Sequence, residues 1–153
     1  MSNIVTTNTT IPALTSESLA KVQAIEYALR QLDQEKVVTE HVIHGGMYAR
    51  TIRLKAGLVL AGVLIELPTI LIVNGDVLMY TGDDTIALQG YQVVPASKGR
   101  KQCMVTIADT DLTMVLATNA KTVHDAEDEF TKEADGLVSR LSTSENLIII
   151  TGE

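Results

Sequence analysis

The sequence predicts a mainly β protein: an antiparallel β-barrel or jelly roll with one helix before it and one after it. The prediction rests on apolar segments of four to eight residues that follow one another through the middle of the chain, each bounded by turn-forming residues. No helical spacing of apolar residues interrupts this region. Short strands at such intervals are typical of a closed antiparallel sandwich or barrel. The expected strands are residues 48–54, 58–65, 70–73, 77–80, 91–94, 104–107 and 112–117.

Clusters of glycine, asparagine and aspartate separate these segments. Asn74, Gly75 and Asp76 stand between two of the apolar runs and predict a turn there. Two pairs of aspartates in the expected loops are also interpreted as turn-forming residues. The alternative is that either pair binds a calcium ion weakly. These are the pairs Asp83 with Asp84 and Asp109 with Asp111.

Composition is that of a single globular domain. A chain of 153 residues is long enough to bury roughly 70% of its unfolded surface. Hydrophobic residues make up 46% of it and aromatic residues only 3%. We therefore expect an apolar barrel interior built from aliphatic side chains. The single cysteine, Cys103, lies next to an expected strand and is interpreted as a small buried hydrophobic residue, with a reactive thiol as the alternative.

The charge balance argues against nucleic acid as a partner. The formal net charge is −7, and neither basic clusters nor aromatic platforms are present, which disfavours contact with phosphate backbones. Residues 1–10 lack the cationic and apolar regions of a signal peptide. No apolar stretch reaches the ~20 residues of a membrane-spanning helix. We therefore expect a soluble protein made in a cytosol, with no membrane partner.

The first 35 residues predict an extended arm and then a helix. Residues 1–15 are rich in threonine and asparagine, which makes them too polar to pack on their own. Over residues 16–35, apolar side chains recur at spacings of three and four, as on one face of an amphipathic helix. Ser16 is the expected N-cap. The stripe consists of Leu19, Val22, Ile25, Leu29 and Leu32.

The barrel itself is expected over residues 40–118, and a second helix over residues 122–141. One face of this helix is apolar, and we interpret its acidic residues as a solvated face. The apolar stripe is Val123, Ala126, Phe130, Ala134, Leu137 and Leu141. The acidic residues are Asp125, Glu127, Asp128, Glu129 and Glu133.

The last segment, residues 146–151, predicts a strand. An exposed aliphatic strand is prone to aggregation, so it must pair with another strand. Its partner is either a strand of the same chain or a strand of a neighbouring subunit. The candidate oligomer contacts are Leu147, Ile148, Ile149 and Ile150.

Tyr48, Arg50 and Glu66 are the candidate polar residues at the mouth of the barrel. Two-residue alternation places Tyr48 and Arg50 on the same strand face as Ile52. A buried arginine is costly without a counter-charge, so we expect Arg50 to pair with a carboxylate such as Glu66 or Asp76. The alternative is a pocket for an anion or carboxylate inside the barrel.

The sequence predicts no catalytic residue, no metal ligand and no cofactor. His41 and His44 are three residues apart before the first expected strand, and on a strand they would point to opposite faces. They converge on a metal only if a turn intervenes, so solvated or hydrogen-bonded imidazoles are the simpler interpretation. His124, in the first turn of the second helix, is expected at the surface. Neither a nucleophile motif nor a phosphate loop is present.

Several stretches of the chain share their order and spacing with a known family. They are residues 44–57 (HGGMYARTIRLKAG), 58–62 (LVLAG), 71–76 (LIVNGD), 90–96 (GYQVVPA), 99–101 (GRK) and 108–114 (ADTDLTM). Together with the leading helix and residues 125–130, they resemble small cupin-like proteins of the RmlC-like jelly-roll type, encoded by tailed bacteriophages and prophages. The resemblance covers about residues 16–135 and implies a cupin-like barrel.

One departure from that family concerns its metal site. Relatives often carry histidine and glutamate shortly after the second glycine of this pattern, whereas residues 63–69 here are VLIELPT. Ile65 and Thr69 stand where imidazoles are expected, and Pro68 stands at the carboxylate position. Only Glu66 is ionisable. Because aliphatic side chains offer no donor atoms, the resemblance implies the fold without the inherited metal site.

These observations predict a non-enzymatic structural or assembly protein, a bacteriophage virion component made in the cytoplasm of a bacterial host. The expected partners are further copies of the chain and other virion proteins. The alternative is a metal-dependent cupin enzyme or a module that binds a small sugar or acid, with Tyr48, Arg50, Glu66, His41 and His44 at its mouth. A third interpretation is a host-takeover factor that binds a bacterial protein through the acidic helix.

Overall fold

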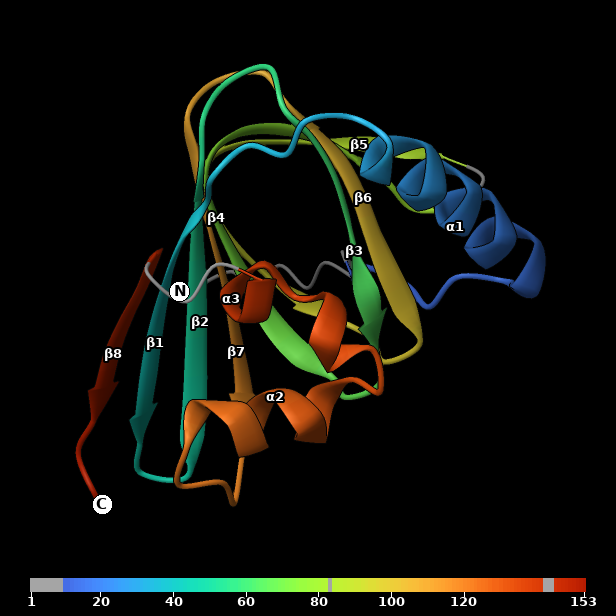
Figure 1. Cartoon of the computed structure of the whole chain (residues 1–153). Helices are drawn as coiled ribbons and strands as arrows, with labels where there is room; N and C mark the ends of the chain where they lie inside the picture. Colours follow the sequence, from blue (N-terminus) through green and yellow to red (C-terminus); the bar gives the residue numbers. More distant parts are fainter. Residues whose placement is uncertain (1–9, 83, 142–144) are drawn as a thin grey trace, which may run out of the picture.

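The body of the protein is one curled β-sheet, with helices before and after it in the chain (Figure 1). The computed structural model describes residues 10–82, 84–141 and 145–153. In chain order the elements are α1 (Ser16–Arg30), β1 (Val38–His44), β2 (Met47–Leu54), β3 (Val59–Ile65), β4 (Thr69–Tyr80), β5 (Thr85–Ala96), β6 (Arg100–Thr106), β7 (Thr110–Ala117), α2 (Val123–Phe130), the 3-10 helix η1 (Ala134–Gly136), α3 (Val138–Leu141) and β8 (Asn146–Ile150). The predicted mainly β class with flanking helices is confirmed.

The sheet encloses an interior, but its two outer strands do not pair with each other. Neighbouring strands follow the order β3-β6-β4-β7-β2-β1-β8, and β5 pairs with β4. In the described part of the chain β3, β5 and β8 each pair with one strand and are therefore edges, and the predicted β-barrel or jelly roll takes the form of a curled sheet. β8 lies parallel to β1, because the chain returns to this edge only after passing through α2 and α3. The helical segment after β7 lies across one end of the sheet (Figure 1).

β4 is one continuous strand, which corrects the predicted turn at residues 74–76. Its first part pairs with β7 and its second part with β6, while β5 pairs along its whole length. The change of partner falls at Gly75, where an added Cβ atom would lie 2.7 Å from Thr110 Cα. Only glycine permits so close an approach of two backbones. The turn-like signal therefore marks the place where a long strand changes partner.

The first hairpin connects β1 to β2 through Gly45 and Gly46. Both glycines have positive φ angles, 59° and 74°, as a two-residue turn of the type I′ class requires. The hairpin pairs His44 with Met47. β1 begins at Val38, two residues before the predicted start of the barrel, so His41 and His44 lie in a strand rather than before one.

α1 is shorter than the predicted helix over residues 16–35. Its N-cap is Thr15, whose hydroxyl accepts a hydrogen bond from the Ser18 N–H, and not the predicted Ser16. The helix ends at Arg30. Gln34 Nε2 donates to the carbonyl oxygens of Leu29 and Leu32, each at 2.8 Å. This side chain satisfies backbone acceptors that a helix terminus leaves unpaired, and the chain then turns toward β1.

The predicted second helix, residues 122–141, is broken into α2, η1 and α3. The N-cap is Thr122, in agreement with the predicted boundary, but Thr131 adopts an extended conformation and ends α2. The break allows Phe130 to be buried on one side of it and Ala134 and Leu137 on the other. An unbroken helix would keep these side chains on a single straight face, whereas here all three join the same apolar cluster across the break.

Two apolar clusters form the core. One, which includes Leu71 and Met104, lies within the sheet. The other joins Tyr48 of β2 to Phe130 and Leu137, and it attaches the C-terminal helices to the sheet. Of the predicted N-terminal arm, residues 1–9 lie outside the described residues, while Ile11 is buried and bridges to β5. Within the described ranges, no helix is both long and apolar enough to span a lipid bilayer.

Candidate functional site

A cavity of about 290 Å³ lies between the sheet and the helices. Residues of α1, β2, β3, β4, β6 and β7 contribute to its wall, together with residues between 130 and 141. The predicted aliphatic lining is present. It includes Ile52, Ile65, Leu71, Leu112 and Met114. The polar lining residues are Glu26, Arg30, Gln34, Arg50 and Gln102.

Arg50 is buried in the β2 wall of the cavity, and its counter-charge is Glu127 of α2. Arg50 Nη1 donates to Glu127 Oε2 at 2.8 Å and to Ser139 Oγ at 2.9 Å, and the Ser139 hydroxyl donates to the same carboxylate. Glu127 is only 2% exposed, which corrects its assignment to a solvated face. Such a buried pair is stable because each charge has several partners. The expectation that Arg50 pairs with a carboxylate is met, but by neither Glu66 nor Asp76.

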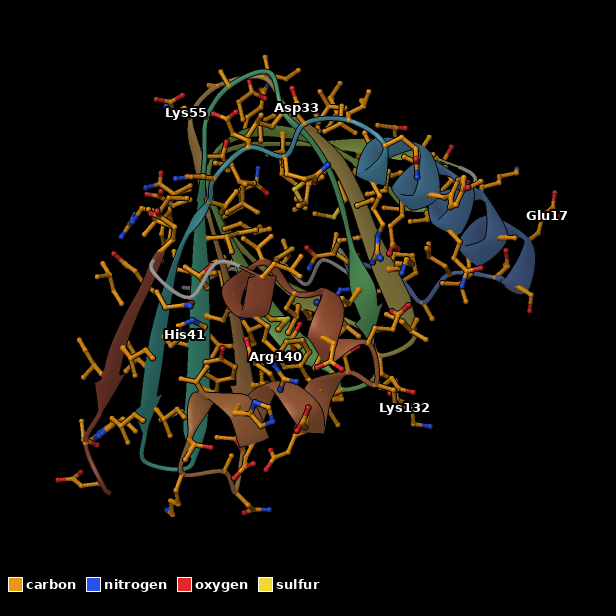
Figure 2. All side chains as sticks on the ribbon, viewed as in Figure 1. Glu17, Asp33, His41, Lys55, Lys132 and Arg140 are labelled. Atoms are coloured by element: carbon orange, nitrogen blue, oxygen red, sulfur yellow. The ribbon has the colours of Figure 1, made fainter. Side chains whose placement is uncertain are left out.

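Arg140 of α3 is the second cation on Glu127. Its Nε atom donates to Glu127 Oε1 at 3.0 Å, and its other nitrogens reach the carboxylates of Asp128 at 2.8 Å and Asp135 at 3.0 Å. It also donates to the His124 carbonyl oxygen at 2.8 Å. Arg140 therefore connects α3 to α2 (Figure 2). The positive charges of Arg50 and Arg140 are thus balanced by the carboxylates of Glu127, Asp128 and Asp135.

A chain of hydrogen bonds runs from Arg50 to the start of β8. Arg50 Nη1 contacts the Tyr48 hydroxyl at 3.5 Å, and that hydroxyl is 2.6 Å from His41 Nδ1. On the other side of the ring, His41 Nε2 is 2.7 Å from Asn146 Oδ1. Asn146 Nδ2 donates to the Ser139 carbonyl oxygen at 2.7 Å, so its Oδ1 is an acceptor. His41 therefore carries its proton on Nε2 and accepts from Tyr48 at Nδ1.

Burial keeps the side chains of His41 and Tyr48 uncharged near pH 7. Burial lowers the pKa of His41 below its ordinary value of 6.5, although the hydrogen bond to Asn146 partly opposes this. Burial raises the pKa of Tyr48 to about 12. A buried network in which donors and acceptors match one another is rigid. Its evident role is to hold β8 and α3 against β1 and β2.

The depressed pKa of His41 predicts that the folded state loses stability in mild acid. Above about pH 6.5 the ring is neutral in both the folded and the unfolded state. Below that pH only the unfolded ring takes up a proton, so the stabilisation is lost as the pH falls toward the folded pKa. Urea unfolding at a series of pH values should show a weaker loss below about pH 6.5 for His41→Gln than for the wild type. The exposed His44→Gln variant is the control and should keep the wild-type slope. Equal slopes for all three proteins would refute the assignment.

The structure brings together two of the three residues predicted at the barrel mouth. Tyr48 and Arg50 lie side by side in β2 and share the same hydrogen-bond network. Glu66 lies outside that network, in the connection after β3, with its carboxylate 3.9 Å from Lys132 Nζ. The predicted mouth is therefore corrected at this position. Glu127, predicted to lie on a solvated helix face, is the carboxylate that pairs with Arg50 in place of Glu66.

The structure also tests the predictions for the histidines and for the loop aspartates. His41 is buried and His44 exposed, so the two imidazoles diverge as expected for residues three apart on a strand. His124 lies at the surface, also as expected. Asp109 accepts a hydrogen bond from the Ala56 N–H at 2.9 Å, which supports its assignment to turn formation. Asp83 lies outside the described residues.

The donor set does not fit a metal ion in the cavity. The only carboxylate among the described lining residues is Glu26, which is held by Arg30 at 2.6 Å and by Lys101. Both ring nitrogens of His41 are engaged by protein partners. Nowhere in the described ranges do three or more histidine, cysteine, aspartate or glutamate side chains converge as a metal would require. Ile65 and Thr69 stand at the positions where the resemblance places histidines, and neither carries an imidazole nitrogen.

β6 buries two adjacent cations that sequence reasoning missed. Arg100 donates to Thr69 Oγ1 at 2.8 Å and to the Ser97 carbonyl oxygen at 2.9 Å, and burial lowers its pKa to about 10. Lys101 points the other way, toward the carboxylates of Glu26 and Glu133. Lys101 is buried because α1 packs against β6 and places Glu26 beside its ammonium group.

One of the missed residues carried a detectable signal. Glu127 is four residues after Val123 and three before Phe130, so its spacing places it on the apolar face of α2. Its membership of a run of acids obscured this. Ser139 and Gln102 carry no comparable signal, because their positions depend on contacts between distant parts of the chain.

Cys103 is buried as expected, and burial raises the pKa of its thiol.

β8 presents an aliphatic edge to solvent. Its residues pair with β1 from Thr39 to Ile43, and no other described strand pairs with β8. The side chains at positions 147, 148, 149 and 150 are between 44% and 60% exposed. Because successive side chains on a strand alternate, both faces of β8 are exposed as well as its free edge.

Comparison with known proteins finds similarity at the level of the fold. No protein-family model matches the chain, and no curated protein matches it. Among solved structures, a cupin superfamily protein from Desulfitobacterium hafniense is 10% identical, with a TM-score of 0.48, and the match covers 57% of this chain and 83% of that one. An RmlC-like cupin family protein with a double-stranded β-helix fold, from Methanocaldococcus jannaschii, is 16% identical, with a TM-score of 0.46 and coverage of 56% and 84%.

Salicylate 1,2-dioxygenase from Pseudoaminobacter salicylatoxidans is also similar. It is 12% identical, with a TM-score of 0.47, and the match covers 65% of this chain but only 31% of the dioxygenase. At such identities the similarity concerns the backbone alone. The solved structures that this chain resembles thus include cupin and RmlC-like proteins and an enzyme.

Proposed function

We propose that this protein is a non-enzymatic assembly protein that forms homo-oligomers through strand β8. The observation that carries the proposal is the exposed aliphatic edge of that strand. Natural edge strands are protected by lysine, proline, bulges or covering segments, and residues 147–150 contain neither lysine nor proline. A second copy of the chain that pairs with this edge would bury the aliphatic side chains and satisfy the free backbone groups.

The edge is held in a conformation ready for pairing. On its inner side β8 is hydrogen-bonded to β1 along the register from Asn146 to Ile150. Its first residue is tied to the buried network through Asn146 and His41, and just after it the Thr151 N–H donates to the Ile43 carbonyl oxygen. Little conformational entropy is therefore lost when a partner binds. Two β8 strands related by a two-fold axis would meet antiparallel and form a closed dimer.

The absence of enzymatic activity is part of the proposal, and the site supports it. The Ser139 hydroxyl and the Glu127 carboxylate lie within hydrogen-bonding distance of each other, as a nucleophile and its base would. Both are buried, and both are also hydrogen-bonded to Arg50. The resemblance to cupin-like proteins of tailed bacteriophages supports placing the protein in a virion assembled in a bacterial cytoplasm. Other virion proteins are then its further partners.

Placing a charge on β8 tests the proposed interface. Wild-type protein at micromolar concentration should have a mass well above the 16.5 kDa of one chain by size-exclusion chromatography with light scattering. Ile149→Lys should weaken self-association at least about tenfold, because a lysine on an edge strand opposes pairing with another strand. The matched control is Val93→Lys, since Val93 is an aliphatic residue of β5 that is 53% exposed. That variant should assemble as the wild type does.

Two results would contradict the proposal. A wild-type protein that stays at the mass of one chain would exclude self-association, and an Ile149→Lys variant that assembles normally would exclude β8 as the interface. The proposed location is checked by mass spectrometry of purified phage particles, in which the chain should be present at several copies per particle. Its absence from the particles would exclude a virion role while leaving the oligomer interface standing.

A further inference from the structure

The cavity is large enough for a small organic molecule. Its volume is about 290 Å³, whereas an engineered apolar cavity of ~150 Å³ holds benzene. By that comparison it accommodates a molecule of roughly ten to fifteen non-hydrogen atoms. None of its described lining residues belongs to β8, so a ligand there would not compete with the proposed oligomer interface.

Gln102 is the polar group that such a molecule would meet. The residue lies in β6 within the cavity wall and is 9% exposed. Its side-chain amide forms no hydrogen bond with any described residue and is not among the fully buried polar atoms, so it is free to bond to a molecule in the cavity. Across the strand pair, a Cβ atom on Gly62 would lie 3.6 Å from Gln102 Cβ. The missing side chain at Gly62 leaves the space beside Gln102 open.

The charges around the cavity are already paired with one another. Arg50 is neutralised by Glu127 at 2.8 Å. Glu26 is held by Arg30 at 2.6 Å and by Lys101. A charged ligand would thus lose its hydration without gaining an unpaired counter-charge, which is unfavourable. This disfavours the anion pocket considered from the sequence and favours an uncharged ligand.

We propose that this cavity is a binding site for a small uncharged molecule. The ligand is mainly apolar and carries one group that exchanges a hydrogen bond with the amide of Gln102. Hydroxyl, phenol and amide groups all satisfy this requirement, because the glutamine amide both donates and accepts. The aliphatic wall supplies non-directional affinity and Gln102 supplies orientation.

Three naphthalene derivatives of nearly the same size test the proposal. 2-Naphthol is uncharged near neutral pH and carries a hydroxyl group, naphthalene lacks the polar group, and 2-naphthoate is an anion. Isothermal titration calorimetry with the full chain should give a Kd on the order of 100 µM or tighter for 2-naphthol. Binding of 2-naphthoate should be at least about tenfold weaker. No saturable binding of 2-naphthol, or equal binding of 2-naphthoate, would overturn the proposal.

Two variants locate the bound molecule. Gln102→Leu should weaken 2-naphthol binding by about fivefold, the value of one hydrogen bond, and should not weaken naphthalene binding. Val138→Phe adds a ring to a half-buried residue of the cavity wall and should weaken both ligands at least about tenfold by filling the space. Gln23→Leu, at an exposed glutamine of α1, is the matched control.

The outcomes are distinguishable from those for the oligomer. Circular dichroism and thermal unfolding without ligand establish that each variant is folded. Unchanged 2-naphthol binding in both Gln102→Leu and Val138→Phe would place the ligand elsewhere and overturn the proposal. Ile149→Lys should bind 2-naphthol as the wild type does, so loss of the β8 interface leaves the cavity intact, and loss of the cavity leaves the interface intact.

Discussion

Replacing Glu127 by alanine is expected to lower the free energy of unfolding by about 3–5 kcal/mol, the cost of leaving a buried charge without its partner. Arg50 would lose its only charged partner within hydrogen-bonding distance among the described residues, and Arg140 would lose one of three carboxylates. A guanidinium group is not neutralised inside a protein, so the unpaired charge would stay buried. Urea unfolding monitored by circular dichroism measures the change.

The control for this prediction is the next residue in α2. Asp128 also pairs with Arg140, but its side chain is half exposed, so Asp128→Ala should cost less than about 1 kcal/mol. A double variant tests the physical cause. Glu127→Leu combined with Arg50→Met replaces the pair by apolar groups of similar size and should recover most of the loss. Equal destabilisation by Glu127→Ala and Asp128→Ala would show that burial of the pair is not the cause.

The second large effect is expected at Gly75, where alanine should lower the free energy of unfolding by about 3 kcal/mol. The added Cβ atom would lie 2.2 Å from Thr110 Oγ1 and 2.7 Å from Thr110 Cα. A rotation of the threonine side chain relieves the first contact but not the second, which involves backbone. The strands β4 and β7 would have to separate where β4 changes its partner.

Gly62→Ala is the matched control, because Gly62 also lies in a strand. Its added Cβ atom would make only an ordinary contact, 3.6 Å from Gln102 Cβ, and the variant should stay within about 1 kcal/mol of the wild type. Thermal unfolding of the two variants side by side compares them. A Gly75→Ala variant as stable as Gly62→Ala would mean that the approach of β4 to Thr110 is not required.

Much of the architecture was predictable because strands and helices carry local periodic signals. The alternation of Tyr48, Arg50 and Ile52 placed these residues on one strand face, and two of them face the cavity. The aliphatic run of β8 indicated a strand that needs a partner. It pairs with β1 of the same chain, and whether its free edge also joins a neighbouring subunit is the prediction that Ile149→Lys tests.

The errors have a common origin in contacts between distant residues. Asn74, Gly75 and Asp76 have the composition of a turn, but the pairing of β4 with β5, β6 and β7 keeps the strand extended through them. Glu127 resembles its solvated neighbours in the sequence, yet it lies 77 positions from the arginine that it neutralises. No local pattern records such a distance.

The sequence by itself determined the mainly β class, the flanking helices, the aliphatic lining and the need of the last strand for a pairing partner. These properties follow from the spacing of apolar residues along a few turns or strands, and spacing is visible without coordinates. Only the tertiary structure decided which carboxylate faces Arg50, which strands are the edges of the sheet and that Gln102 borders a cavity. Each of these depends on how separate elements come together, because the energy of a buried charge or an unpaired amide is set by its neighbours in space.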